Sequence, residues 1–136
     1  MNFHQFQLHE KIMAGVKVSG YIEPTPIQVK SIPAIMEGRD VMGLAQTGTG
    51  KTAAFALPIL QRLMGGPLGV VRALIIAPTR ELTEQTQNAI SQLGYKTGLR
   101  SLSIYGGVGI LPQIQTLRRG VDIISACPGR LLDHIN

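Results

Sequence analysis

The sequence is short of the residues that make disulfides, aromatic cores and densely charged surfaces. Among 136 residues there is one cysteine, Cys127, no tryptophan, and three each of tyrosine and phenylalanine. A single cysteine excludes an internal disulfide and is typical of a reducing compartment, so we expect a cytoplasmic protein. Charged residues make up only 15% of the chain, whereas hydrophobic residues make up 44%. This balance favours a packed domain over a disordered chain.

Long apolar runs and a secretory leader are also missing from the sequence. No stretch reaches the roughly 18 uninterrupted apolar residues of a membrane-spanning helix. The opening residues Met1-Asn-Phe-His4 lack the basic and apolar segments of a signal peptide. We therefore expect no association with a membrane.

The charge is unbalanced toward basic residues, with a formal net charge of +5 and a pI of about 9.8. A basic excess suits a polyanionic partner, because lysine and arginine contacts with phosphates release condensed counterions. Charge that only keeps the protein soluble is the alternative interpretation.

Short apolar runs alternate with amphipathic segments along the whole chain. The runs predict strands at 41–45, 73–77, 101–105 and 121–125, and the amphipathic segments predict helices at 51–64, 81–93, 110–117 and 129–135. This alternation predicts an α/β fold in which helices flank a parallel sheet. The continuous run at 73–77 is typical of a strand that is covered on both faces. Ligands of such sheets bind beyond the carboxyl ends of the strands.

One glycine-rich segment, Ala45-Gln-Thr-Gly-Thr-Gly-Lys-Thr52, lies between a predicted strand and a predicted helix. This context is typical of a Walker A phosphate-binding loop, although alanine replaces the usual first glycine. Gly48 and Gly50 allow the backbone N–H groups to turn toward phosphate oxygens. Lys51 and Thr52 are the catalytic candidates, since Lys51 can reach the β- and γ-phosphates and the Thr52 hydroxyl can ligate Mg²⁺. The alternative is a glycine turn without a ligand. The predicted phosphate-loop residues are Ala45, Gln46, Thr47, Gly48, Thr49, Gly50, Lys51 and Thr52.

A second segment, 20–28, precedes this loop and contains a helix-start signal. Thr25 is suited to the N-cap of a helix and Pro26 to its first position, which alone could explain most of the segment. Gln28 suggests more, because a primary amide can both donate to and accept from the N6/N7 edge of adenine.

Five segments together resemble the motifs of DEAD-box ATP-dependent RNA helicases. They are the Q motif at 20–28, motif I at 45–52, motif Ia at 78–85, the GG doublet at 106–107 and motif Ib at 127–130. Motif Ia has the form PTRELTEQ, with Thr83 in place of the usual alanine. Motif Ib has the form CPGR, with Cys127 in place of the usual threonine. The phosphate loop and the Pro24–Gln28 segment are also similar to the RhlE-like bacterial group.

This resemblance implies an N-terminal part of the first RecA-like P-loop NTPase domain, with ATP and Mg²⁺ as cofactors. It implies that Gln28 selects ATP over other nucleotides and that Phe3 packs against the base. The alternative for Phe3 is ordinary packing in the core.

The later motifs imply contacts with the sugar–phosphate backbone of RNA, which carry no sequence specificity. Arg80 could instead form an ion-pair cluster with Glu81 and Glu84 or orient its loop, and the glycine doublet could be a simple turn. Arg130 could form a charge-assisted fork to a phosphate. The residues expected to bind RNA are Pro78, Thr79, Arg80, Gly106, Gly107, Gly129 and Arg130.

The acidic Asp-Glu-Ala-Asp tetrapeptide and the Ser-Ala-Thr motif of this family do not occur in the sequence. Asp122 and Asp133 do not lie at the carboxyl end of a predicted strand. We therefore expect an incomplete domain of a longer enzyme, which hydrolyses ATP to separate short RNA duplexes, and no activity from these 136 residues alone. A non-catalytic module that binds nucleotide or RNA is the alternative. A strand-exchanged dimer could complete the sheet.

Overall fold

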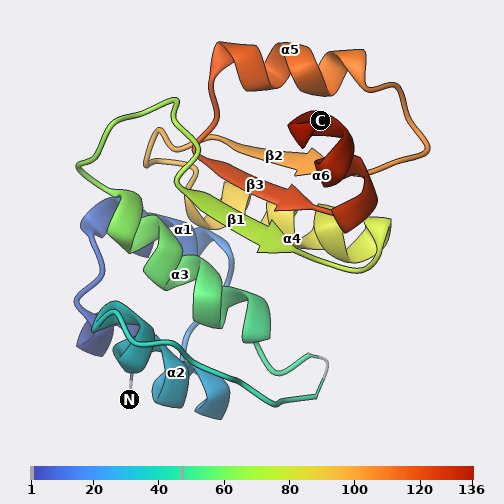
Figure 1. The fold of residues 1–136 in the computed structure, drawn as a ribbon. Coiled ribbons are helices and arrows are strands. Elements are labelled where there is room, and N and C mark those ends of the chain that lie inside the picture. Colours follow the sequence, from blue (N-terminus) through green and yellow to red (C-terminus); the bar gives the residue numbers. More distant parts are fainter. Residues whose placement is uncertain (1, 47) are drawn as a thin grey trace. The chain divides into compact units, whose positions relative to one another are not determined.

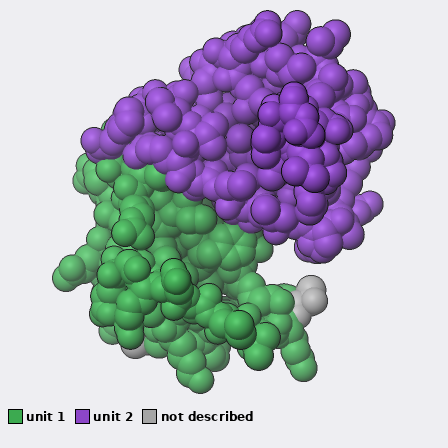
Figure 2. Space-filling model, viewed as in Figure 1, with its two compact units in different colours: residues 1–64, 92–97 green, residues 65–91, 98–136 purple. Residues whose placement is uncertain are grey.

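The chain folds into two compact units (Figures 1 and 2). The computed structural model describes residues 2–46 and 48–136. The first unit comprises the residues up to 64 together with 92–97, and the second comprises 65–91 and 98–136. Within the described residues, no helix is both long enough and apolar enough to cross a membrane.

The first unit is helical in its described residues. It contains a 3-10 helix, η1 (Phe3–Phe6), and three α-helices: α1 (Glu10–Val18), α2 (Pro26–Met36) and α3 (Lys51–Leu63). Its core is made of side chains that repeat at helical spacing and are almost fully buried: Ile12, Val16, Ile32, Leu57 and Leu60. Helix α3 agrees with the prediction at 51–64, and α2 begins at Pro26 after the N-cap Thr25, as the sequence predicts.

Helix α1 was not predicted, although the sequence carries a signal for it. Ile12 and Val16 are four residues apart, so both lie on the face that packs into the core. Gly15 lies on the same side, and a Cβ atom there would be 1.8 Å from the carbonyl oxygen of Leu93. Only glycine permits this close approach of two backbones.

The second unit is a three-stranded parallel sheet with helices on both sides. In chain order it contains β1 (Ala73–Ile76), α4 (Arg80–Leu93, whose last two residues belong to the first unit), β2 (Ser101–Ile104), α5 (Leu111–Arg119), β3 (Ile123–Ala126) and α6 (Pro128–Ile135). The strand order is β1-β3-β2, so the last strand lies in the centre (Figure 1). The predicted order of strands and helices in this unit is confirmed, with boundaries that shift by at most two residues.

Strand β3 is buried along its whole length because helices cover both of its faces. On one face, Ser125 donates a hydrogen bond of 2.9 Å to the carbonyl of Thr83 in α4. On the other face, Ile124 belongs to an apolar cluster that includes α5 and α6: Leu102, Ile104, Leu117, Val121, Ile124, Ala126 and Leu131. The central position of β3 thus explains why all four of its residues are buried.

The prediction that 73–77 is covered on both faces is wrong. Strand β1 pairs only with β3 among the described strands, and Leu74 and Ile76 are 49% and 58% exposed. The reason is its place at the edge of the sheet, since the cluster beneath α5 and α6 involves residues of β2 and β3 and none of β1. An apolar run alone does not distinguish a central strand from an edge strand.

The predicted strand at 41–45 is also absent. The segment has no regular secondary structure, and Met42 and Leu44 are each 88% exposed. A strand exists only when a neighbour pairs with its backbone, and none of the three described strands pairs with this segment. Its backbone therefore has no partner strand among the described residues, and Met42 and Leu44 have no core to pack against.

The exposed edge of β1 leads to a prediction about self-association of the 136-residue chain. Because its outer N–H and C=O groups have no partner strand, we expect association that increases with protein concentration. Leu74→Lys together with Ile76→Glu should shift the sedimentation coefficient to that of a monomer. Leu111→Lys, which changes an exposed leucine of α5, is the control and should leave the association unchanged. Monomeric behaviour of the unaltered chain at every concentration would contradict the prediction.

Candidate functional sites

The glycine-rich loop enters helix α3 through two left-handed residues. Gly48 and Gly50 have φ values of 83° and 85°, which side-chain-bearing residues rarely adopt, and Gly50 is the N-cap of α3. The Thr49 hydroxyl closes the loop with a hydrogen bond of 2.6 Å to the carbonyl of Gln46. Thr47, also predicted to contact phosphate, lies outside the described residues. The conformation of Gly48 and Gly50 thus allows the backbone N–H groups next to them to turn toward one side.

Lys51 and Thr52 occupy the first turn of α3. No acidic residue lies in this turn, so the unpaired N–H groups and the positive end of the helix dipole are not neutralised locally. Lys51 is exposed and borders a cavity of about 230 Å³ between α2, α3 and the 41–43 segment, together with Ile27, Ser31, Ile35, Val41, Gly43, Ala54 and Phe55. The position is suited to an anion such as phosphate.

Gln28 links the start of α2 to the glycine-rich loop. Its side chain is 1% exposed, and both polar atoms are used within the chain. Oε1 accepts a 3.0 Å hydrogen bond from the Thr25 N–H, and Nε2 donates one of 3.1 Å to the Gly50 carbonyl. A Cβ atom at Gly50 would be 2.4 Å from this Nε2, so glycine is needed there for space as well as for backbone conformation. The contact with Gly50 was not predicted. It leaves one lone pair of Oε1 and one N–H of Nε2 for a further partner, because a primary amide accepts two hydrogen bonds and donates two.

Phe3 is packed within the first unit. Its side chain is 2% exposed and lies against two other rings, Phe6 at 5.8 Å and Tyr21 at 6.1 Å between centroids. This placement is the core packing that the sequence left as an alternative. A contact between Phe3 and a base stays a prediction.

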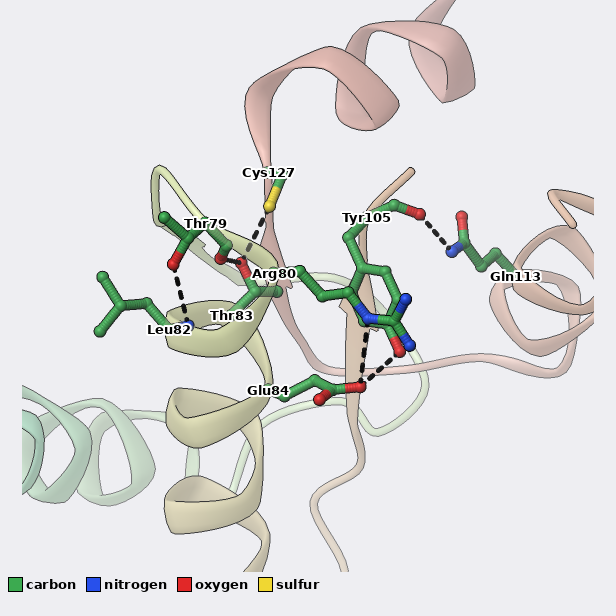
Figure 3. Close-up of polar contacts among 8 residues, drawn as sticks. All are labelled: Thr79, Arg80, Leu82, Thr83, Glu84, Tyr105, Gln113 and Cys127. Atoms are coloured by element: carbon green, nitrogen blue, oxygen red, sulfur yellow. Dashed lines mark hydrogen bonds and ion pairs between the residues drawn. The ribbon is translucent and has the colours of Figure 1, made fainter. Parts of the chain in front are cut away.

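In the second unit, the start of α4 presents three exposed residues that were predicted to bind RNA: Pro78, Thr79 and Arg80. Thr79 caps the helix, because its Oγ1 accepts a 3.2 Å hydrogen bond from the Leu82 N–H. The Arg80 guanidinium lies 4.5 Å from the centroid of the Tyr105 ring, and its Nε is 3.9 Å from Glu84 (Figure 3). Of the two glutamates considered as partners of Arg80, only Glu84 forms the ion pair.

The glycine doublet is an exposed loop that is held at both ends. Gly107 has a φ of 81°, and the carbonyls on either side of the doublet accept hydrogen bonds from other elements. Gln113 Nε2 donates to the Tyr105 carbonyl at 3.1 Å, and Arg130 Nη2 donates to the Val108 carbonyl at 2.9 Å. The loop is therefore anchored, and its exposed face has no side chains at Gly106 and Gly107.

Arg130 has more partners within the chain than the sequence indicated. Its side chain is only 14% exposed, and besides Val108 it contacts Asp133 at 3.5 Å and Gln113 at 3.4 Å. These bonds occupy donors that a phosphate fork would need, so the structure gives Arg130 a supporting position behind the glycine doublet. Gly129 beside it is exposed, with open space around it. Phosphate contacts of both residues stay predictions.

Sequence reasoning missed Gln113, which joins three elements of this region. The buried amide accepts from Arg130 and pairs with His134 Nε2 at 2.8 Å, in addition to its bond to Tyr105. Burial and, to a lesser degree, the charge of Arg130 lower the pKa of His134, and Asp133 acts against them. A polar residue on the inward face of α5 was the only sequence signal for this role.

The two departures from the family motifs contact each other. The Thr83 Oγ1 lies 3.2 Å from the Cys127 Sγ and donates a 2.8 Å hydrogen bond to the Thr79 carbonyl (Figure 3). Thr83 is fully buried. Position 127 thus lacks the usual threonine hydroxyl, and Thr83 supplies a hydroxyl to the same contact between α4 and the start of α6.

The carboxylates of the chain do not form a metal site in the described residues. Asp122 is buried and accepts hydrogen bonds of 2.8 Å from the N–H groups of Gly69 and Arg100, which lie before β1 and β2. No group of three histidine, cysteine, aspartate or glutamate residues that could hold a metal ion occurs in that part of the chain. Asp122 therefore stabilises the amino ends of the strands.

The contact between Thr83 and Cys127 predicts energetic coupling. Thr83→Ala should lower the free energy of unfolding by about 1–2 kcal/mol, because a buried hydroxyl and its hydrogen bonds are lost. In the Thr83→Ala background, Cys127→Thr should recover part of this loss, with a coupling energy of about 0.5 kcal/mol or more in urea denaturation. Thr86→Ala, a buried threonine on the same helix, is the matched control and should be additive with Cys127→Thr. If the changes in unfolding free energy caused by Thr83→Ala and Cys127→Thr simply add, the two residues are not coupled.

Comparisons with known proteins agree with the motifs. A family model described as DEAD/DEAH box helicase matches residues 25–136. The chain is 48% identical over 134 residues to the ATP-dependent RNA helicase CshA of Listeria monocytogenes, covering 98% of this chain and 26% of the relative. It is 43% identical over 134 residues to the DEAD-box ATP-dependent RNA helicase RhpA of Helicobacter pylori, covering 98% and 27%. The chain thus spans about a quarter of the length of these curated relatives.

A solved structure shares the fold. The crystal structure of a DEAD box protein from the hyperthermophile Methanococcus jannaschii matches with a TM-score of 0.92 and 38% identity, covering 100% of this chain and 37% of that one. The sheet and helices are therefore those of a RecA-like domain in part. Together with the match over residues 25–136, this likeness shows that the chain belongs to the DEAD/DEAH box helicase family.

Proposed function

We propose that the protein is an ATP-dependent RNA helicase that hydrolyses ATP to separate short RNA duplexes. Its 1–136 segment would be the N-terminal part of the first RecA-like domain, in the cytoplasm. The observation that carries the proposal is the turn at Gly48 and Gly50, both left-handed, which leads directly into the first turn of α3 at Lys51. The printed names of the relatives, which are ATP-dependent RNA helicases, support it.

ATP would bind with its phosphates at the 45–52 loop and the start of α3. The N–H groups of the loop, the positive end of α3 and the Lys51 ammonium would together stabilise the phosphate charge. The Thr52 hydroxyl would be the Mg²⁺ ligand contributed by this chain, and Mg²⁺ would neutralise charge on the phosphates. The backbone conformation at Gly48 and Gly50 fits a phosphate, because it allows successive N–H groups to point to the same side.

RNA would bind through its backbone at the exposed residues beside the carboxyl ends of the strands in the second unit. Thr79 and Arg80 begin α4, and Gly106-Gly107 follows β2 without side chains that would block a sugar–phosphate chain. Gly129 at the start of α6 is similarly open. Contacts of this kind position the strand and do not read bases, so binding should tolerate any sequence.

A module that binds nucleotide or RNA without turnover is the second candidate. It is favoured by the structural role of Asp122, whose carboxylate accepts hydrogen bonds from two backbone N–H groups. Sequencing the gene beyond the codon for Asn136 distinguishes the two. An in-frame Asp-Glu-Ala-Asp segment followed by Ser-Ala-Thr supports the enzyme, and a stop codon supports the module.

Removal of the Lys51 ammonium tests the nucleotide site. Lys51→Ala should weaken binding of Mg-ATP to the 136-residue chain by about tenfold or more, because a charge-assisted contact is worth about 1.5–3 kcal/mol. Isothermal titration calorimetry measures the change. Lys96→Ala, which removes another lysine of the first unit, should bind as the unaltered chain does. Equal affinities of the Lys51→Ala variant and the unaltered chain would eliminate the phosphate site.

Base selection by Gln28 is tested separately. Gln28→Ala should narrow the preference for ATP over GTP by about 1–3 kcal/mol, the scale of leaving a polar edge without a partner. If Gln28 only supports the loop through Gly50, the substitution will weaken the binding of ATP and of GTP by the same factor. Gln61→Ala removes another amide of this unit, one that accepts a 2.7 Å hydrogen bond from the His9 N–H, and should leave the preference unchanged. Competition binding with the two nucleotides gives the ratio.

A further inference from the structure

The contacts of Arg80 come from two elements that are distant in the sequence. Arg80 and Glu84 lie one turn apart on α4, whereas Tyr105 lies between β2 and the glycine doublet (Figure 3). The guanidinium is 4.5 Å from the ring centroid and its Nε is 3.9 Å from Glu84 Oε1. The same Oε1 accepts a hydrogen bond of 2.5 Å from the Tyr105 hydroxyl. Arg80 and Tyr105 thus contact each other, and both approach the same carboxylate oxygen of Glu84.

Tyr105 is a fixed support for the guanidinium. Its carbonyl accepts from Gln113 and its hydroxyl donates to Glu84, so the residue is held at both ends. The hydrogen bond to Glu84, followed by burial and the charge of Glu84, raises the pKa of the Tyr105 phenol, while Arg80 lowers it. The phenol therefore remains a protonated donor at neutral pH, and the ring keeps its orientation.

The ion pair contributes little to stability, because both side chains are about half exposed. The exposed fractions are 51% for Arg80 and 45% for Glu84, and pairs in such surroundings are screened by water. Its main physical effect is to restrict Arg80. A free arginine loses considerable rotamer entropy when it binds a phosphate, and a side chain that is already held loses less.

The Arg80 guanidinium keeps part of its hydrogen-bonding capacity. In the described part of the chain its face lies over the Tyr105 ring, its Nε approaches Glu84, and a side-chain hydrogen bond links it to the Tyr105 phenol. A guanidinium has five N–H groups, so these contacts leave N–H groups for a ligand on its exposed side. Two parallel N–H groups of this kind match the oxygens of a phosphate. Arg130 differs in this respect, because its Nη groups donate to Gln113 and Val108.

We propose that Glu84 and Tyr105 are positioning residues for RNA binding, which hold the Arg80 guanidinium as a preformed fork for one backbone phosphate. The proposal rests on the RNA-binding part of the proposed function. Glu84 occupies the variable place of the PTRELAxQ pattern, so the resemblance assigns it no role. The network also connects the start of α4 with the residue before Gly106, so one strand of RNA could contact both segments at a fixed spacing.

The charge of Glu84 makes its removal a decisive test. Removing a negative charge near a polyanion should by itself strengthen binding. Loss of the support for Arg80 should instead weaken it. We expect Glu84→Ala to lower the affinity for RNA by about three- to tenfold, the scale of ordering one long side chain. Glu84→Gln should restore the affinity, since an amide oxygen can still accept from Tyr105 and Arg80. Glu81→Ala removes a charge three residues before Glu84 from a residue that is not the ion-pair partner of Arg80. This variant should bind RNA slightly more tightly than the unaltered chain.

The number of phosphate contacts gives a second readout. Anisotropy titrations of a fluorescein-labelled oligouridylate over a series of KCl concentrations yield the slope of log K against log salt. Arg80→Ala should reduce the magnitude of this slope by about 0.7, as expected for one lost contact with single-stranded RNA. Tyr105→Leu should reduce the slope in the unaltered background and have no further effect on Arg80→Ala. Tyr95→Leu, which removes a ring with Lys96 5.8 Å from its centroid, is the control and should change nothing.

The outcomes separate this inference from the proposed function. If Arg80→Ala weakens RNA binding but Glu84→Ala behaves like Glu81→Ala, the positioning role is wrong and the RNA site remains. If the unaltered chain binds no oligouridylate, or Arg80→Ala binds as well as the unaltered chain, the assignment of Arg80 to RNA is wrong and the positioning role falls with it. Thermal unfolding followed by circular dichroism verifies that each variant is folded, and Glu84→Gln or Tyr105→Phe is used in place of a variant that does not fold.

Tyr105→Phe removes only the hydroxyl, so it should weaken RNA binding less than Tyr105→Leu, which removes the ring. If neither Tyr105 variant weakens RNA binding, the proposal is overturned.

Discussion

Burial of β3 on both faces is the constraint on which the second unit depends. Its neighbours β1 and β2 pair with it and not with each other, so the sheet exists only through this strand. Its side chains alternate between the α4 side, where Ser125 bonds the Thr83 carbonyl, and the apolar cluster that contains Ile124. A strand in this place must be apolar or fully hydrogen-bonded, because an unpaired polar group there would be costly.

The amino ends and the carboxyl ends of the strands in this sheet differ in their interactions. At the amino ends, the Asp122 carboxyl group accepts hydrogen bonds from the chain before β1 and before β2, so a buried polar group with partners closes the loops there. At the carboxyl ends, backbone groups and side chains such as Arg80 remain exposed. Buried interactions such as those of Thr83, Cys127 and Gln113 lie directly behind them. The candidate RNA surface is thus a set of exposed groups and glycines supported by buried interactions, which is how parallel sheets commonly carry function.

In the first unit, a single buried side chain supports an exposed loop in a similar way. Gln28 is buried at the start of α2 and bonds the carbonyl of Gly50, at the point where the loop becomes α3. A change at Gln28 therefore acts on the conformation of the phosphate loop as well as on any base. The amide can serve both segments only because Gly50 has no Cβ.

The sequence by itself determined the features that depend on neighbouring residues. The glycines at 48 and 50, the helix start at Thr25-Pro26, the order of strands and helices in the second unit and the family motifs are all local, because backbone conformation and capping act over a few residues. The tertiary structure alone decided which apolar run became the central strand, why 41–45 forms no strand, and which partners Arg80, Arg130 and Gln113 have. These outcomes depend on contacts between segments far apart in the chain, and a residue's type limits such contacts without choosing among them.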